Sequence, residues 1–103
     1  MGEEADFIAL CKEYLAGADE DKQSAGAEGL AQIEGDGAAV AQTELIAALK
    51  SKNALVRYKS AVALGNIGAK ATEEAKAGLA ALASDSDEQV KESAKEALGN
   101  LNK

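Results

Sequence analysis

The sequence predicts an all-α fold, an α-solenoid of three antiparallel helix pairs with six helices in all. Three observations support this prediction: a composition that favours helix and lacks proline, a repeat of 34 residues, and a good N-cap residue at the same phase of each copy. The chain of 103 residues is expected to form one domain, with repeats at about 3–34, 37–68 and 72–101.

The composition limits both the core and the function. Because Phe7, Tyr14 and Tyr58 are the only aromatic residues, the core must consist of Leu, Ile, Val and Ala, so the helices can pack closely. A net charge of -7 argues against nucleic-acid binding, which needs cations to displace counterions from phosphates. No apolar run approaches the roughly 20 residues that span a bilayer, and the sequence shows no basic segment followed by an apolar one, the pattern of a signal peptide, although a chain from which one had been removed would look the same. We therefore expect a cytoplasmic protein that does not bind membranes.

The repeat is clearest in its last two copies. Segments 53–67 and 87–101 are identical at five of fifteen positions, where unrelated sequences would share about one. The identical pairs are Val56/Val90, Ala63/Ala97, Leu64/Leu98, Gly65/Gly99 and Asn66/Asn100. A more divergent copy at 19–33 keeps only a few apolar positions. It shares Ala27, Leu30 and Ile33 with Ala61, Leu64 and Ile67 of the middle copy.

Each copy begins where a helix is expected to begin. Asp19, Asn53 and Asp87 are N-cap residues, whose side-chain oxygen accepts a hydrogen bond from an otherwise unpaired backbone N–H. The residues that follow recur at i, i+4, i+8 and i+11, which places them on one face of a helix. They are Val56, Ser60, Leu64 and Ile67 in the middle copy and Val90, Ala94, Leu98 and Leu101 in the last.

A second amphipathic helix is expected before each of these, at about 3–16, 37–50 and 72–83. Asp36 and Thr72 are candidate N-caps. The expected buried residues are Phe7, Ile8, Cys11, Leu15, Leu45, Ile46, Leu49, Leu79 and Leu82. The turns are expected to need left-handed residues, which glycine supplies most easily. The glycines at these turns are Gly17, Gly35 and Gly68. Since no helix pair can bury its apolar face alone, neighbouring pairs must stack.

The second helices resemble the HEAT-like repeat family, in the short form found in phycobilisome lyases. Its signature runs roughly Asp-x-x-x-x-Val-Arg-x-x-Ala-x-x-Ala-Leu-Gly-x-Ile. The last repeat matches through Asp85, Val90, Lys91, Ala94, Ala97, Leu98, Gly99 and Leu101. The middle repeat matches through Val56, Arg57, Ala63, Leu64, Gly65 and Ile67. It departs at Ser51 and Ser60, and the first repeat departs at Lys22, Gln23 and Ala31. Over residues 5–101 the resemblance implies a right-handed solenoid with the second helices on its concave face, and says little of function.

Catalysis has few possible participants in this chain. Histidine is absent, and Cys11 lies in phase with apolar residues, so we expect a buried small hydrophobe rather than a nucleophile. The acidic segments 19–21 and 85–88 could suggest calcium, but the sixth position counted from Asp85 is Val90, where an EF-hand needs glycine. The lyase resemblance also raises tetrapyrrole handling, which the lack of histidine and the few aromatic residues oppose. We expect no enzyme, no metal and no cofactor.

The charge is distributed unevenly along the chain. Residues 1–44 carry a net charge of -9, residues 45–72 carry +5, and residues 73–103 carry -3. Two interpretations remain open for Arg57 and Lys59. They could pair with acidic residues of the flanking repeats, or they could steer an acidic partner to the middle repeat.

Tyr58 and Val62 stand out on the middle second helix. The equivalent positions of the outer repeats are polar, since Ser24 and Glu92 correspond to Tyr58, and Glu28 and Glu96 correspond to Val62. Tyr58 either packs on a neighbouring helix or faces the groove that the resemblance implies. A tyrosine between two basic residues has the composition of interface hot spots.

These features predict a non-catalytic module that binds a protein or peptide segment on the second-helix face, and we expect that segment to be acidic. The module's candidate residues are Arg57, Tyr58, Lys59 and Val62. The alternative is a structural unit that stacks end to end, or a fragment of a longer array. Because the first and last repeats are acidic, we expect a monomer or weak self-association.

Overall fold

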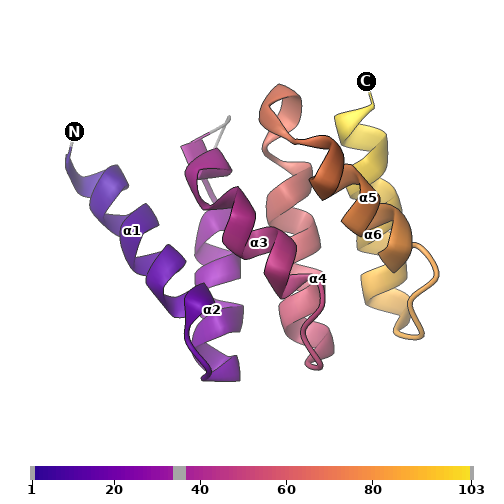
Figure 1. Cartoon of the computed structure of the whole chain (residues 1–103), viewed down its shortest axis with the longest axis horizontal. Coiled ribbons are helices and arrows are strands. Elements are labelled where there is room, and N and C mark those ends of the chain that lie inside the picture. The colour runs from indigo at the N-terminus through magenta and orange to yellow at the C-terminus, as the bar shows by residue number, and fades with distance from the viewer. Residues whose placement is uncertain (1, 34–36, 103) are drawn as a thin grey trace.

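The computed structural model describes residues 2–33 and 37–102, and all regular secondary structure within them is helical (Figure 1). The six α-helices and two 3₁₀ helices follow one another along the chain. They are α1 (Gly2–Ala16), α2 (Glu20–Ala31), η1 (Gly37–Ala41), α3 (Gln42–Ala48), α4 (Ala54–Gly65), η2 (Gly68–Lys70), α5 (Glu73–Leu82) and α6 (Glu88–Leu101). The predicted all-α solenoid is confirmed.

The helices form two layers. The second helix of each pair packs on the next, α2 on α4 and α4 on α6, while α3 and α5 cover one side of this row (Figure 1). The smallest dimension of the molecule, 18 Å, fits two layers of helices, because packed helix axes lie about 8–10 Å apart. Helix α1 packs mainly against α2 and lies at the N-terminal end of the molecule.

The predicted N-caps are confirmed wherever the structure describes them. Asp19, Asn53, Thr72 and Asp87 each precede a helix and accept hydrogen bonds from its first backbone N–H groups. Asp36 and Gly35 lie outside the described residues.

The expected helix over 37–50 is broken into two parts. It begins as the 3₁₀ helix η1 and becomes α-helical only over α3. The residue before α3 is Ala41, whose side chain cannot cap the helix, so nothing there enforces an α-helical start.

Of the two described turn glycines, one has the predicted left-handed conformation and the other does not. Gly68 has a φ of 72°, the left-handed conformation that was expected. Gly17 does not, because the only positive φ among the described residues is that of Gly68. The N–H of Gly17 instead donates to the Tyr14 carbonyl (3.3 Å), so α1 ends in a tight turn that needs no left-handed residue.

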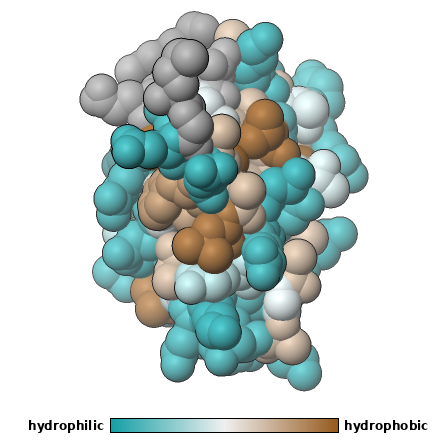
Figure 2. Space-filling view, turned by 90° about the vertical axis from the view of Figure 1, so that its left-hand side faces the viewer, coloured by the Kyte–Doolittle hydropathy of each residue, from teal (hydrophilic) through white to brown (hydrophobic). Residues whose placement is uncertain are grey.

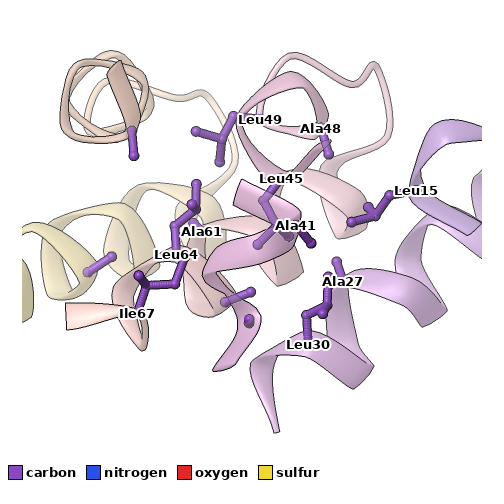
Figure 3. Close-up of a cluster of buried hydrophobic side chains, with 14 of the residues drawn as sticks. Leu15, Ala27, Leu30, Ala41, Leu45, Ala48, Leu49, Ala61, Leu64 and Ile67 are labelled. Carbon is purple, nitrogen blue, oxygen red and sulfur yellow. The ribbon is translucent and has the colours of Figure 1, made fainter. Parts of the chain in front are cut away.

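Leucine and alanine build the core, as the composition predicted. Small side chains such as Ala27, Ala41 and Ala61 lie among the leucines and let the helices approach closely (Figure 3). Most of the residues expected to be buried are buried, and Ile46 is partly buried. The confirmed residues are Ile8, Cys11, Leu15, Leu45, Leu49, Leu79 and Leu82.

Phe7 was wrongly expected in the core and is 42% exposed. Its ring approaches α2 at Gly29, where an added Cβ would lie 2.8 Å from the ring. The equivalent residues of the next repeats, Ala41 and Ala75, are fully buried between helices. Phe7 stays half exposed because α1 is the end helix, and no described helix packs on its outer side.

Candidate functional site

The second-helix face is the side of α2, α4 and α6 that points away from α3 and α5. On this face Tyr58 and Val62 lie one turn apart on α4 and line a groove of about 350 Å³ between α4 and α6. Both side chains are partly buried, and Tyr58 also packs against the core. Both interpretations of Tyr58 therefore hold in part, because its side chain packs against the core and also lines a groove.

Leu55 belongs to the same surface and was missed from the sequence. It is 49% exposed, and its spacing from Tyr58 and Val62 (i, i+3, i+7) places all three on one stripe of α4. The alignment of the repeats could have identified Leu55, because the equivalent residues are the polar Asp21 and Gln89. The apolar stripe is Leu55, Tyr58 and Val62.

The wall of the groove opposite the apolar stripe is acidic. Glu88, Glu92 and Glu96 recur every fourth residue along α6 and line the groove together with Gln89 and Ser93. The Lys91 ammonium lies 3.2 Å from a Glu88 carboxylate oxygen, whereas Glu92 and Glu96 form no ion pair with any cation in the described part of the chain. The groove lining thus holds three carboxylates and no basic side chain.

Arg57 does not face the groove. Its guanidinium makes two hydrogen bonds with the Asp85 carboxylate, from Nε (2.9 Å) and from Nη2 (3.1 Å). Its Nη1 donates to the carbonyls of Ser51 (3.0 Å) and Lys52 (3.1 Å). With only 16% and 10% of their side chains exposed, Arg57 and Asp85 join the α3–α4 turn to the α5–α6 turn. This is a structural contact.

The same pair determines the titration of Asp85. Its hydrogen bonds with Arg57, supported by one from the Asp87 backbone N–H (2.9 Å), hold the pKa of the Asp85 carboxyl below its usual range. The ionised form is favoured because both donors bind the charged carboxylate.

Lys59 is also occupied within the molecule. Its ammonium lies 2.9 Å from a Glu28 carboxylate oxygen on α2 and 5.4 Å from the centre of the Tyr58 ring. Of the four candidate residues, the structure brings Tyr58 and Val62 together in the groove and pairs Arg57 and Lys59 with acids of the flanking repeats. For these two basic residues, internal pairing is the interpretation that the structure supports.

The remaining candidates for chemistry are structural groups. Cys11 is buried as predicted, and burial raises the pKa of its thiol, which makes it a weak nucleophile at neutral pH. Asp19 and Asp87 cap helices, and Asp85 pairs with Arg57. Within residues 2–33 and 37–102, no three His, Cys, Asp or Glu side chains are placed close enough together to hold a metal ion.

A larger hollow of about 590 Å³ lies between the α1–α2 turn and the end of α3. Its charged lining is mixed, with Glu20 and Glu44 beside Lys50 and Lys52. Since neither sign prevails there, it selects no particular ligand charge, unlike the acidic groove.

None of the helices in the described part of the chain is both long and apolar enough to cross a membrane.

Comparison with known proteins agrees with this architecture. Residues 8–99 match the family described as HEAT repeats, so the match covers most of the chain. Among curated proteins, the chain has no significant match. An all-helical row of stacked helix pairs, together with this match, shows that the chain belongs to the HEAT repeat family.

Proposed function

We propose that this chain is a non-catalytic interaction module that binds a protein segment on its second-helix face, centred on the apolar stripe of α4. HEAT repeats commonly mediate protein–protein interaction or scaffolding, and the family is generally non-catalytic. The chemistry of the described residues agrees, because its one thiol is buried and its acidic turns are engaged in caps and an ion pair.

One observation carries the proposal. The middle repeat places Leu55, Tyr58 and Val62 at the surface beside a groove, at positions where the outer repeats are polar. Packing within the solenoid does not require this, since the outer repeats fold with Ser, Glu, Asp or Gln there. Aromatic residues in partly buried positions are enriched among the residues that dominate binding energy.

The test uses peptides selected from a random library displayed on phage, with the whole chain as bait. We expect Tyr58→Ala to weaken the affinity of a selected peptide about tenfold, which corresponds to about 1.4 kcal/mol. Tyr14→Ala is a matched control, because Tyr14 is also partly buried and has Lys22 over its ring at 5.7 Å. Titration calorimetry measures both affinities.

Leu55→Ala and Leu10→Ala form a second matched pair, with parent side chains 49% and 44% exposed. Only Leu55→Ala should weaken the selected peptides. Equal effects of each variant and its control, or no effect of Tyr58→Ala and Leu55→Ala, would move the site away from α4.

A second candidate function is end-to-end stacking. Helix α1 exposes Phe7 and Leu10, and apolar side chains reach the surface at this end of the molecule (Figure 2). Terminal repeats of solenoids usually present polar outer faces, so an apolar end supports self-association. Sedimentation velocity at several concentrations tests it. Stacking predicts concentration-dependent assembly that Leu10→Glu abolishes, and a wild-type monomer at every concentration contradicts it.

A further inference from the structure

We propose that the segment bound in the α4–α6 groove is cationic, with a Lys or Arg beside an apolar side chain. This inference rests on the proposed function and names the chemistry of its partner. It reverses the expectation drawn from the sequence, where the basic middle repeat suggested an acidic partner.

The reversal follows from where the charges lie. Of the five basic residues that make the middle repeat cationic, the two on α4 form ion pairs on either side of that helix. Arg57 is held by Asp85 in the α5–α6 turn, and Lys59 is held by Glu28 on α2. The groove itself is lined by Glu88, Glu92 and Glu96 of α6. An acidic segment in the groove would meet three carboxylates and no available cation from its lining.

The apolar stripe adds a second requirement. Tyr58 and Val62 border the same groove as the carboxylates, so the occupant must offer apolar contact and positive charge within a short distance. Lysine and arginine can do both, because their methylene stems lie along apolar surface while the charged group reaches outward. An arginine can also stack on a tyrosine ring. The spacing of about 6 Å between residues one helical turn apart on α6 suits cations spaced along a peptide.

The charge of the whole chain supports the same partner. With a net charge of -7, the protein repels nucleic acids and acidic proteins and attracts basic segments from a distance. That long-range attraction alone would not choose a place on the surface. The local requirement does, because Glu92 and Glu96 are both exposed, lack ion-pair partners among the described residues, and flank the apolar stripe.

The experiment sequences the peptides selected on wild-type protein at about 150 mM salt and measures one of them against matched variants. We expect enrichment of Lys and Arg next to Leu or an aromatic residue. Glu92→Gln with Glu96→Gln should weaken the chosen peptide roughly fivefold, as two exposed charge pairs allow. Asp6→Asn with Glu13→Gln removes the same charge from exposed positions of α1 and should change the affinity less than twofold.

The outcomes separate the two proposals. If Tyr58→Ala has no effect on any selected peptide, the binding face itself is wrong and the proposed function fails. If Tyr58→Ala weakens binding but the peptides are acidic, or Glu92→Gln with Glu96→Gln has no effect, only the cationic partner is wrong. Equal weakening by the two double variants means attraction to net charge alone and overturns the site-specific inference. Self-association that Tyr58→Ala abolishes would give the groove to a second copy of the chain.

Discussion

Gly65 of α4 touches Ala97 of α6 so closely that a Cβ added at Gly65 would lie 2.8 Å from the Ala97 Cβ. Glycine at this position lets α4 and α6 approach closely beside the groove. The equivalent residue of the last repeat, Gly99, has open space where its Cβ would be. The same motif glycine thus lies in two different environments, and whether a larger side chain fits there depends on which helix packs against it.

This contrast predicts opposite effects of one substitution. Gly65→Ala should lower the free energy of unfolding by about 1–2 kcal/mol, because α6 must shift to admit the methyl group. Gly99→Ala should raise it by about 0.5–1 kcal/mol, since alanine favours the helix and meets nothing. Urea denaturation of both variants checks this. Similar shifts of both variants in one direction would show that helix propensity, rather than the α4–α6 contact, governs both positions.

Ser60 is a buried polar residue without a partner. Its side chain is fully buried, and its Oγ forms no hydrogen bond with the described residues. Since an unpaired buried hydroxyl costs about 1–3 kcal/mol, Ser60→Ala should stabilise the protein by about 1 kcal/mol. Ala94 occupies the same position in the last repeat, so the smaller side chain is compatible with the packing.

A matched serine provides the control for Ser60. Ser93 is only partly buried and its Oγ donates to the Val90 carbonyl (3.4 Å), so Ser93→Ala should change stability by less than about 0.5 kcal/mol. Thermal melts of both variants make the comparison. A lower melting temperature for Ser60→Ala would mean that the hydroxyl has a partner after all.

The Arg57–Asp85 pair should be the most costly ion pair to break. Asp85→Asn should lower the free energy of unfolding by about 2 kcal/mol, because it leaves a mostly buried guanidinium without its charged partner. Glu28→Gln removes the more exposed Lys59–Glu28 pair, in which the Glu28 side chain is 53% exposed, and should cost less than about 1 kcal/mol. Chemical denaturation distinguishes them, and equal costs would contradict the role of burial.

The same pair makes stability depend on pH in a definite direction. The pKa of Asp85 is lower in the folded protein than in the unfolded chain, so near pH 3–4 the unfolded chain binds more protons. The contribution is therefore present above about pH 4 and is lost as the pH falls through the folded pKa. The difference in stability between wild type and Asp85→Asn should shrink from about pH 5 toward pH 2. A difference that stays constant over this range would rule out the charged form as the stabilising one.

Asn66 should stabilise the contact between the first two repeats. Its side-chain Nδ2 donates to the Ala31 carbonyl (2.8 Å) at the end of α2, where helical carbonyls lack intrahelical partners. Asn66→Ala should cost about 1 kcal/mol. Asn100, the equivalent residue of the last repeat, is exposed and has no such bond among the described residues, so Asn100→Ala should have almost no effect. Equal unfolding midpoints for the two variants would contradict this assignment.

The sequence predicted the features that depend on local or periodic physics. Helix starts at Asp19, Asn53, Thr72 and Asp87 depend on a side chain and the backbone a few residues away, so they can be recognised without a structure. The 34-residue period then assigned the core, because every copy must bury the same face. Phe7 shows the limit of that reasoning, since a position that is buried in the inner repeats is half exposed on the end helix.

The character of the candidate site was decided only by tertiary structure. The sequence identified Tyr58 and Val62 by their difference from the outer repeats, but it could not tell where the charge of Arg57 and Lys59 would go. Their partners, Asp85 and Glu28, lie 28 and 31 residues away along the chain and become neighbours only when the repeats stack. Ion pairs are short-range contacts between specific atoms, so a basic stretch of sequence can border an acidic groove.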